Sequence, residues 1–167
     1  MKVLVTGGLG FIGSHTVVEL QNKGFEVVII DNLSNSSIEV LDGITAITGV
    51  KPHFEKLDLK EKVDVVQFFE KYNDIVGVIH FAASKAVGES VKEPLMYYEN
   101  NIGTLVYMLQ EVSKLDKQNF IFSSSCTVYG QADELPITEN APIKPAESPY
   151  GNTKQIGEEI IRDTCKV

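Results

Sequence analysis

The stretch "VTGGLGFIGSHTVVELQNKGFEVVIID" (residues 5–31) decides the fold of this chain. A β-branched run ends in glycines, a helical pattern of apolar residues follows, and a second apolar run ends at Asp31. A continuous apolar strand of this kind is typical of a parallel sheet that is buried on both faces. The order strand, glycine turn, helix, strand therefore predicts the start of a doubly wound α/β fold.

The rest of the chain repeats this alternation. The patterns predict strands over residues 2–6, 26–31, 53–58, 75–82 and 119–125. They predict helices over residues 11–23, 37–47, 59–72 and 94–115, and a last helix from 149 to the chain end. With right-handed crossovers, these elements predict a single Rossmann-type domain over residues 1–167, with a parallel sheet in the order 3-2-1-4-5. Residues 130–149, which hold four of the six prolines, are expected to form a loop.

The glycine turn and the acid after the second strand predict a dinucleotide site. Gly7, Gly10 and Gly13 would allow a tight turn and let a pyrophosphate approach free N–H groups at the helix start. Asp31 lies 24 positions after Gly7, the spacing of an acid that binds a ribose 2′-OH, and its charge favours NAD over NADP. Two other readings stay open: a glycine turn without a ligand, and an aspartate that starts a turn with Asn32.

Two further motifs carry candidate chemistry. Asp58 ends the third predicted strand, where it could meet the adenine or cap a helix that begins near Leu59. In "SPYGNTK" (148–154), Tyr150 and Lys154 are four residues apart and would share one helix face. Such a pair also arises by chance, so it gains weight only from the rest of the chain.

Composition excludes several classes of function. The formal net charge of −8 argues against a nucleic-acid binder, and no stretch approaches a membrane span. Two cysteines do not make a disulfide framework, which favours a reducing compartment and a cytoplasmic protein. The three histidines lack the spacing of metal ligands, and packing is expected for His15 and His80. Cys126 is expected to be an ordinary buried thiol.

The glycine spacing, "FSSSCTVYG" (122–130) and "SPYGNTK" together resemble the extended short-chain dehydrogenase/reductase family. Within it, "DNLSNS" (31–36) and "HFAASKAVGESVKEPLMYYENN" (80–101) are similar to the UDP-glucose 4-epimerases, also called UDP-galactose 4-epimerases. The likeness covers nearly the whole chain. Because that family continues into a smaller C-terminal substrate domain, the resemblance implies that residues 1–167 are an N-terminal portion truncated before it.

The resemblance implies an isomerase that interconverts UDP-galactose and UDP-glucose by transient oxidation at sugar C4 with tightly bound NAD. Tyr150 would be the general base, and Lys154 would favour its phenolate and bond the nicotinamide ribose. Ser125 would bond the C4 oxygen and relay the proton, although serines also commonly mark a strand end. Lys85 would approach the nicotinamide ribose or the sugar phosphate, unless it is simply a solvated loop lysine.

The resemblance also extends the set of binding residues. The expected cofactor-binding residues are Gly7, Gly10, Phe11, Ile12, Gly13, Asp31, Asn32, Ser34, Asn35, Asp58, Leu59, Phe81, Ala82, Ala83, Lys85, Asn100, Ser123, Tyr150 and Lys154. The expected substrate-binding residues are Lys85, Ser125, Cys126, Thr127 and Tyr150, and no metal is assigned. Packing explains Phe81, Ala82 and Thr127 equally well, and a helix asparagine bonded to backbone would look like Asn100.

Two segments depart from the epimerase pattern. "AAS" (82–84) stands where Ala-Gly-Leu is usual, which changes the wall of the cofactor trough. "NNIGT" (100–104) is one residue shorter than the family's run, which leaves open whether Asn101 contacts the cofactor.

Other functions remain as alternatives. A nucleotide-sugar 4,6-dehydratase or decarboxylase would share the glycine turn, Tyr150 and Lys154, but usually carries an acid where this chain has Cys126 and Thr127. A non-catalytic NAD-binding module is the second alternative, and the truncated chain alone is expected to bind NAD without turnover. The helices at 94–115 and 149–165 are expected to pair with a second subunit as a homodimer. The sequence leaves the sugar specificity open.

Overall fold

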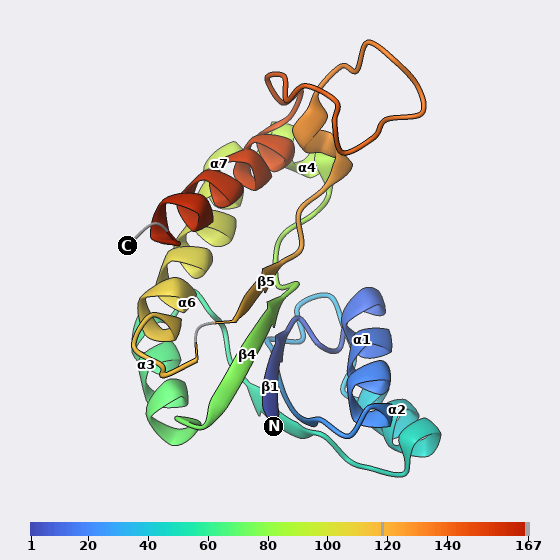
Figure 1. Ribbon diagram of the computed structural model, residues 1–167, viewed down its shortest axis with the longest axis vertical. Helices are drawn as coiled ribbons and strands as arrows, with labels where there is room; N and C mark the ends of the chain where they lie inside the picture. Colours follow the sequence, from blue (N-terminus) through green and yellow to red (C-terminus); the bar gives the residue numbers. More distant parts are fainter. Residues whose placement is uncertain (118, 166–167) are drawn as a thin grey trace. The chain divides into compact units, whose positions relative to one another are not determined.

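The computed structural model describes residues 1–117 and 119–165, and Figure 1 shows its ribbon. The chain divides into two units. The first comprises Met1–Ala82 with Gln110–Ser123, and the second comprises Ala83–Leu109 with Ser124–Val167.

A five-stranded parallel sheet forms the first unit. Its strands are β1 (Lys2–Thr6), β2 (Glu26–Asp31), β3 (His53–Lys56), β4 (Ile75–His80) and β5 (Phe120–Phe122). Their order is β3-β2-β1-β4-β5, which confirms the predicted topology. In the middle of the sheet, Thr6 of β1 lies opposite Ile30 of β2 and His80 of β4. This order brings the ends of β1, β2 and β3, and the segments that follow them, to one edge.

The first two strands have the predicted bounds, but the other three end earlier than predicted. β4 ends at His80 because its neighbour β1 ends at Thr6 and turns at Gly7. The Phe81 N–H still donates to the carbonyl of Thr6, but β1 offers no partner beyond that point. β5 ends in the same way, with the Ser123 N–H on the carbonyl of His80. β3 ends at Lys56, which pairs with Asp31, the last residue of β2.

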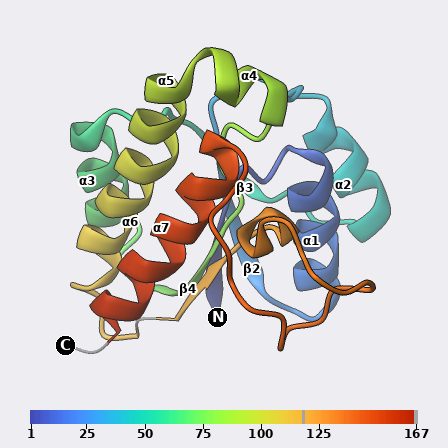
Figure 2. The ribbon, with the colours of Figure 1, turned by 90° about the horizontal axis from the view of Figure 1, so that it is seen from above.

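Helices cover both faces of this sheet. α1 (Phe11–Asn22) and α2 (Val40–Thr48) lie side by side on one face, and α3 (Lys62–Lys71) lies on the other, as Figures 1 and 2 show. The core between the sheet and the α1–α2 layer consists of Val5, Leu9, Val17, Val27, Ile29, Leu41 and Ile44. α2 and α3 each begin three residues later than predicted, because short turns at 37–41 and 58–61 come first.

The second unit is helical. It contains α4 (Val87–Lys92), α5 (Pro94–Tyr98), a π-helical turn η1 (Glu99–Gly103), the larger part of α6 (Thr104–Val112), a 3₁₀ turn η2 (Cys126–Tyr129) and α7 (Pro149–Thr164). α7 packs against α4, α5 and η2. The helix predicted over 94–115 begins at Pro94 as expected, but η1 makes its middle π-helical and it ends at Val112. The sequence patterns also missed α4 and η2.

The start of α7 follows from its first residues. Ser148 is the N-cap, with its Oγ 3.1 Å from the Gly151 N–H that it accepts, and Pro149 occupies the first turn. The helix begins where predicted and ends at Thr164, while the part of the prediction at 166–167 lies outside the described residues. Over the described ranges, no helix combines the length and apolar character that crossing a bilayer requires.

Candidate active site

The glycine turn is built so that only glycines fit. Gly7 has φ of +66°, and a Cβ there would lie 2.9 Å from the backbone nitrogen of Ala82. A Cβ at Gly13 would lie only 2.2 Å from the carbonyl oxygen of Gly7. Gly10 is the N-cap of α1 and has no side chain to cap the helix. The first N–H groups of α1 can therefore serve an anion, as a pyrophosphate site requires.

The predicted residues at the start of α1 face solvent. Phe11 is 78% exposed and Ile12 is 61% exposed. The ring of His15 packs on that of Phe11 at 4.8 Å between centroids, in line with the expected packing, although His15 itself is exposed.

Asp31 ties the glycine turn to the loop after β2. The residue is 9% exposed, and its carboxylate accepts hydrogen bonds from the Leu9 N–H at 3.1 Å, the Leu33 N–H at 3.0 Å and the Ser36 hydroxyl at 2.8 Å. The turn that sequence reasoning left as an alternative is therefore present. Leu33 has φ of +62°, a conformation that few non-glycine residues adopt. The carboxylate thus shapes both sides of the predicted adenosine site.

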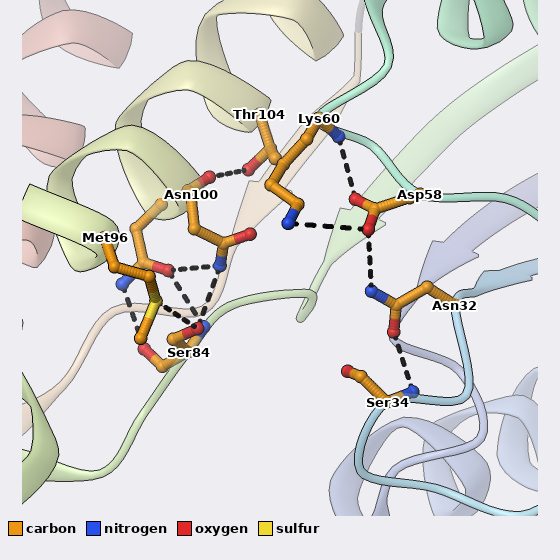
Figure 3. Close-up of polar contacts among 9 residues, drawn as sticks. Asn32, Ser34, Asp58, Lys60, Ser84, Met96, Asn100 and Thr104 are labelled. Atoms are coloured by element: carbon orange, nitrogen blue, oxygen red, sulfur yellow. Dashed lines mark hydrogen bonds and ion pairs between the residues drawn. The ribbon is translucent and has the colours of Figure 1, made fainter.

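Asn32, Ser34 and Asp58 come together after β2 and β3, as Figure 3 shows. The Asn32 side-chain amide donates to an Asp58 carboxylate oxygen at 3.2 Å, and its carbonyl accepts the Ser34 N–H at 3.0 Å. Asp58 also accepts the Lys60 N–H at 3.0 Å and lies 3.7 Å from the Lys60 ammonium. Sequence reasoning missed Lys60. The capping role for Asp58 is wrong, because the N-cap of α3 is Glu61.

The other residues of the first unit that were predicted to bind the cofactor differ in how exposed they are. Leu59 is buried, and Asn35 is exposed. Phe81 is partly buried and packs against the α1–α2 core, which supports the packing reading for this residue. Ala82 lies against Gly7, and Ser123 follows β5. His80 is buried as expected, and its Nδ1 lies 2.8 Å from the Thr6 hydroxyl.

Tyr150 and Lys154 meet on α7 of the second unit. The Lys154 Nζ lies 6.0 Å from the centroid of the Tyr150 ring, as expected for residues on one helix face. Lys154 is 4% exposed, whereas Tyr150 is partly exposed. Burial lowers the pKa of Lys154 from 10.5 to about 8, so the ammonium still predominates at pH 7. The cation that could favour a phenolate is therefore present but easily deprotonated.

Ser125 is connected to α7 through Thr127. The Ser125 Oγ caps η2 by accepting the Thr127 N–H at 3.3 Å, and it accepts the Thr127 hydroxyl at 2.9 Å. A Cβ at Gly151 would lie 3.2 Å from the Thr127 Oγ1, so Thr127 sits directly beside the residue that follows Tyr150. The hydroxyl of Ser124 donates to the Glu158 carboxylate on the same helix.

Cys126 is exposed, and the expectation of a buried thiol is wrong. Cys126 is the first residue of the 3₁₀ turn η2, which sequence reasoning missed.

The paired asparagines of η1 form a hydrogen-bond network with Ser84, part of which Figure 3 shows. The Asn101 carbonyl accepts the Ser84 N–H at 2.8 Å and the Asn100 amide at 3.0 Å. The Asn101 amide donates to the Ser84 carbonyl at 2.9 Å and to the Thr153 hydroxyl at 3.1 Å. Thr153 in turn donates to the Tyr150 carbonyl at 2.7 Å. Asn101 therefore braces α7 between Tyr150 and Lys154.

Asn100 is partly buried and donates to the Ser84 hydroxyl at 3.1 Å as well as to Asn101. Lys85 is exposed and Ala83 is partly buried, which leaves both readings of Lys85 open. Sequence reasoning missed Ser84 and Thr153, and the Tyr-x-x-x-Lys spacing gives no signal for either.

Two further observations concern the possible ligand sites of the chain. A cavity of about 490 Å³ lies beside α7 and is lined by Tyr98, Pro145, Ala146, Glu147, Ser148, Pro149, Asn152 and Gln155, none of which is a predicted site residue. In residues 1–117 and 119–165, no group of three or more histidine, cysteine, aspartate or glutamate side chains is placed to hold a metal ion.

Comparison with known proteins gives relatives over nearly the whole chain. The UDP-glucose 4-epimerase of Haemophilus influenzae is 48% identical over 166 residues, which cover 99% of this chain and 49% of the relative. The UDP-glucose 4-epimerase of Bacillus subtilis is 49% identical over 163 residues, covering 98% and 48%. The chain thus spans about half the length of the curated relatives that it matches.

Solved structures agree. The UDP-glucose 4-epimerase of Bifidobacterium longum in complex with NAD+ and UDP has a TM-score of 0.93 at 45% identity, covering 98% of this chain and 48% of that one. The enzyme of Stenotrophomonas maltophila, with bound NAD and formylated UDP-arabinopyranose, has a TM-score of 0.91 at 44% identity and the same coverage. The family model described as GDP-mannose 4,6 dehydratase matches residues 4–166. The chain therefore belongs to this family of nucleotide-sugar enzymes, within the extended short-chain dehydrogenase/reductases, and its relatives there are UDP-glucose 4-epimerases.

Proposed function

We propose that residues 1–167 are the NAD-binding domain of a UDP-glucose 4-epimerase, an isomerase that interconverts UDP-galactose and UDP-glucose by transient oxidation at sugar C4. The observation that carries the proposal is the buried Lys154 beside Tyr150 on a helix that Asn101 bonds through Thr153 and that η2 packs against. The relatives of the chain, named UDP-glucose 4-epimerases, support the same reaction.

The first unit would hold the adenosine and pyrophosphate part of NAD. Side chains at Gly7 and Gly13 would clash with backbone, so the turn that would hold the pyrophosphate can form only with glycines there. The uncapped N-terminus of α1 would donate N–H groups to the phosphates. Asp31 would accept ribose hydroxyls, and the Asn32–Asp58 pair would face the adenine.

The second unit would supply the proton chemistry, while bound NAD would accept the hydride from sugar C4. Tyr150 would take the proton of the 4-OH as a general base, and the Lys154 ammonium would stabilise its phenolate. Because Thr127 donates to the Ser125 Oγ, the hydroxyl proton of Ser125 remains available for the C4 oxygen. Lys85 would bind the nicotinamide ribose or a sugar phosphate.

A 4,6-dehydratase is the second candidate, because the matching family model carries that description. Ser125 is followed here by Cys126 and Thr127, neither of which is an acid that could remove a sugar proton or assist elimination. We therefore rank the epimerase first. We further propose a cytoplasmic homodimer that pairs through the segments 94–112 and 149–164.

The test begins with NAD binding by titration calorimetry. The chain should bind one equivalent of NAD, and Asp31→Ala in one unit and Lys154→Met in the other should both weaken binding of that same equivalent. The purified chain is expected to convert UDP-galactose negligibly by itself. A chain that binds no NAD would overturn the proposed function, and rapid epimerisation by the chain alone would overturn the view that it needs a further domain.

A further inference from the structure

Tyr97 is a second tyrosine in the same unit as Tyr150, and its hydroxyl makes three close polar contacts. The side chain is 0% exposed. Its hydroxyl oxygen lies 2.9 Å from both the nitrogen and the carbonyl oxygen of Ala86, and 2.6 Å from a carboxylate oxygen of Glu89. A phenol has one proton, so it accepts the Ala86 N–H and donates to the Glu89 carboxylate or the Ala86 carbonyl.

These contacts fix the segment that carries Lys85. Ala86 follows Lys85 directly, and Glu89 lies in the first turn of α4. Burial, followed by the hydrogen bond to Glu89, raises the pKa of Tyr97 to about 12. The hydroxyl therefore keeps its proton at any physiological pH, and the contact does not titrate.

The ring of Tyr97 also touches the proposed base. The centroids of the Tyr97 and Tyr150 rings are 6.5 Å apart, and the ring planes meet at 82°. This edge-to-face arrangement is a favoured aromatic contact. One side chain thus joins the Lys85 segment, through its hydroxyl, to the side of Tyr150, through its ring.

We propose that Tyr97 and Glu89 form a clamp that positions Lys85 and the ring of Tyr150, so that Tyr97 is a positioning residue for the reaction without touching the substrate. This inference rests on the proposed function. Phenylalanine would fill a purely packed core position equally well, and it would need no polar partner. Three polar contacts to the segment after Lys85 are what packing alone leaves unexplained.

The test compares Tyr97→Phe with Tyr98→Phe. Both variants lose only a hydroxyl, but the Tyr98 hydroxyl accepts the side-chain amide of Asn152 on α7 at 2.7 Å, whereas the Tyr97 hydroxyl contacts Ala86 and Glu89. In Tyr97→Phe, the Ala86 amide should exchange its hydrogen about tenfold faster, and NAD should bind about tenfold more weakly. Tyr98→Phe should match the unmodified chain in both measurements.

A double variant identifies the route. If the clamp acts through Lys85, then Lys85→Ala combined with Tyr97→Phe should bind NAD no more weakly than Lys85→Ala alone. Strictly additive losses, or wild-type NAD affinity in Tyr97→Phe, would overturn the inference. The proposed function fails in a different way, by the absence of NAD binding in the unmodified chain, and the positioning role would then fall with it.

Discussion

The burial of Lys154 makes the stability of the chain depend on pH in a defined direction. Its ordinary pKa of 10.5 falls to about 8 in the folded chain because burial disfavours the ammonium. At about 1.4 kcal/mol per pKa unit, this difference costs the folded state about 3 kcal/mol wherever Lys154 is charged in both states. The full cost applies below about pH 8.

The cost is relieved as the pH rises. Between about pH 8 and 10.5 the unfolded chain binds more protons at this lysine than the folded chain, so the free energy of unfolding increases with pH. Lys154→Met keeps most of the side-chain volume and removes the charge. The variant should therefore be more stable than the unmodified chain by about 3 kcal/mol at pH 7 but by only about 1 kcal/mol at pH 9.5.

Urea unfolding followed by circular dichroism at the two pH values measures both free energies. Lys92→Met is the matched control, because Lys92 is an exposed lysine of α4 in the same unit. The free energy of unfolding of Lys92→Met should differ from that of the unmodified chain by the same amount at both pH values. The reasoning would be refuted if the difference in unfolding free energy between Lys154→Met and the unmodified chain were as large at pH 9.5 as at pH 7.

Three other substitutions test the framework of the site. Asp31→Ala removes the acceptor for three hydrogen bonds and should cost about 2–3 kcal/mol in urea unfolding, with a smaller loss for Asp31→Asn; equal losses would contradict this. Gly13→Ala should prevent folding, because its Cβ would lie 2.2 Å from a backbone oxygen, whereas Gly43→Ala, with open space in α2, should gain up to about 1 kcal/mol. A Gly13→Ala chain with normal thermal unfolding would show that the turn can shift. Asn101→Ala should cost about 3 kcal/mol by leaving buried partners unsatisfied, and a loss below about 1 kcal/mol would show that water replaces the amide.

Sequence patterns predicted the first unit well, because its site depends on residues that lie close together in the chain or on adjacent strands. Gly7 and Gly13 are needed by contacts within a few residues or with the adjacent strand, and Asp31 lies at a fixed spacing after them. The apolar runs predicted the strands, and their alternation with helices predicted the strand order. The strand ends were less predictable, because the end of β4 depends on where β1 turns and not on its own residues.

The second unit was harder to predict, because its key contacts join residues far apart in the chain. Asn101 and Thr153 are 52 positions apart, and Asn152 reaches Tyr98 across 54 positions. Apolar periodicity continues through 94–112, so it gives no sign that a π turn interrupts the helix. Tyr97 looks like one apolar position in that pattern, and only the structure shows the partners of its hydroxyl.

The π turn at Glu99–Gly103 also determines how this part of the chain would respond to a change in length. A wider backbone loop within a helix can absorb the gain or loss of a residue, whereas a regular helix would rotate every following side chain by about 100°. Removing one residue from Glu99–Gly103 would convert the π turn into a regular turn and leave Leu105 and Met108 in their buried places.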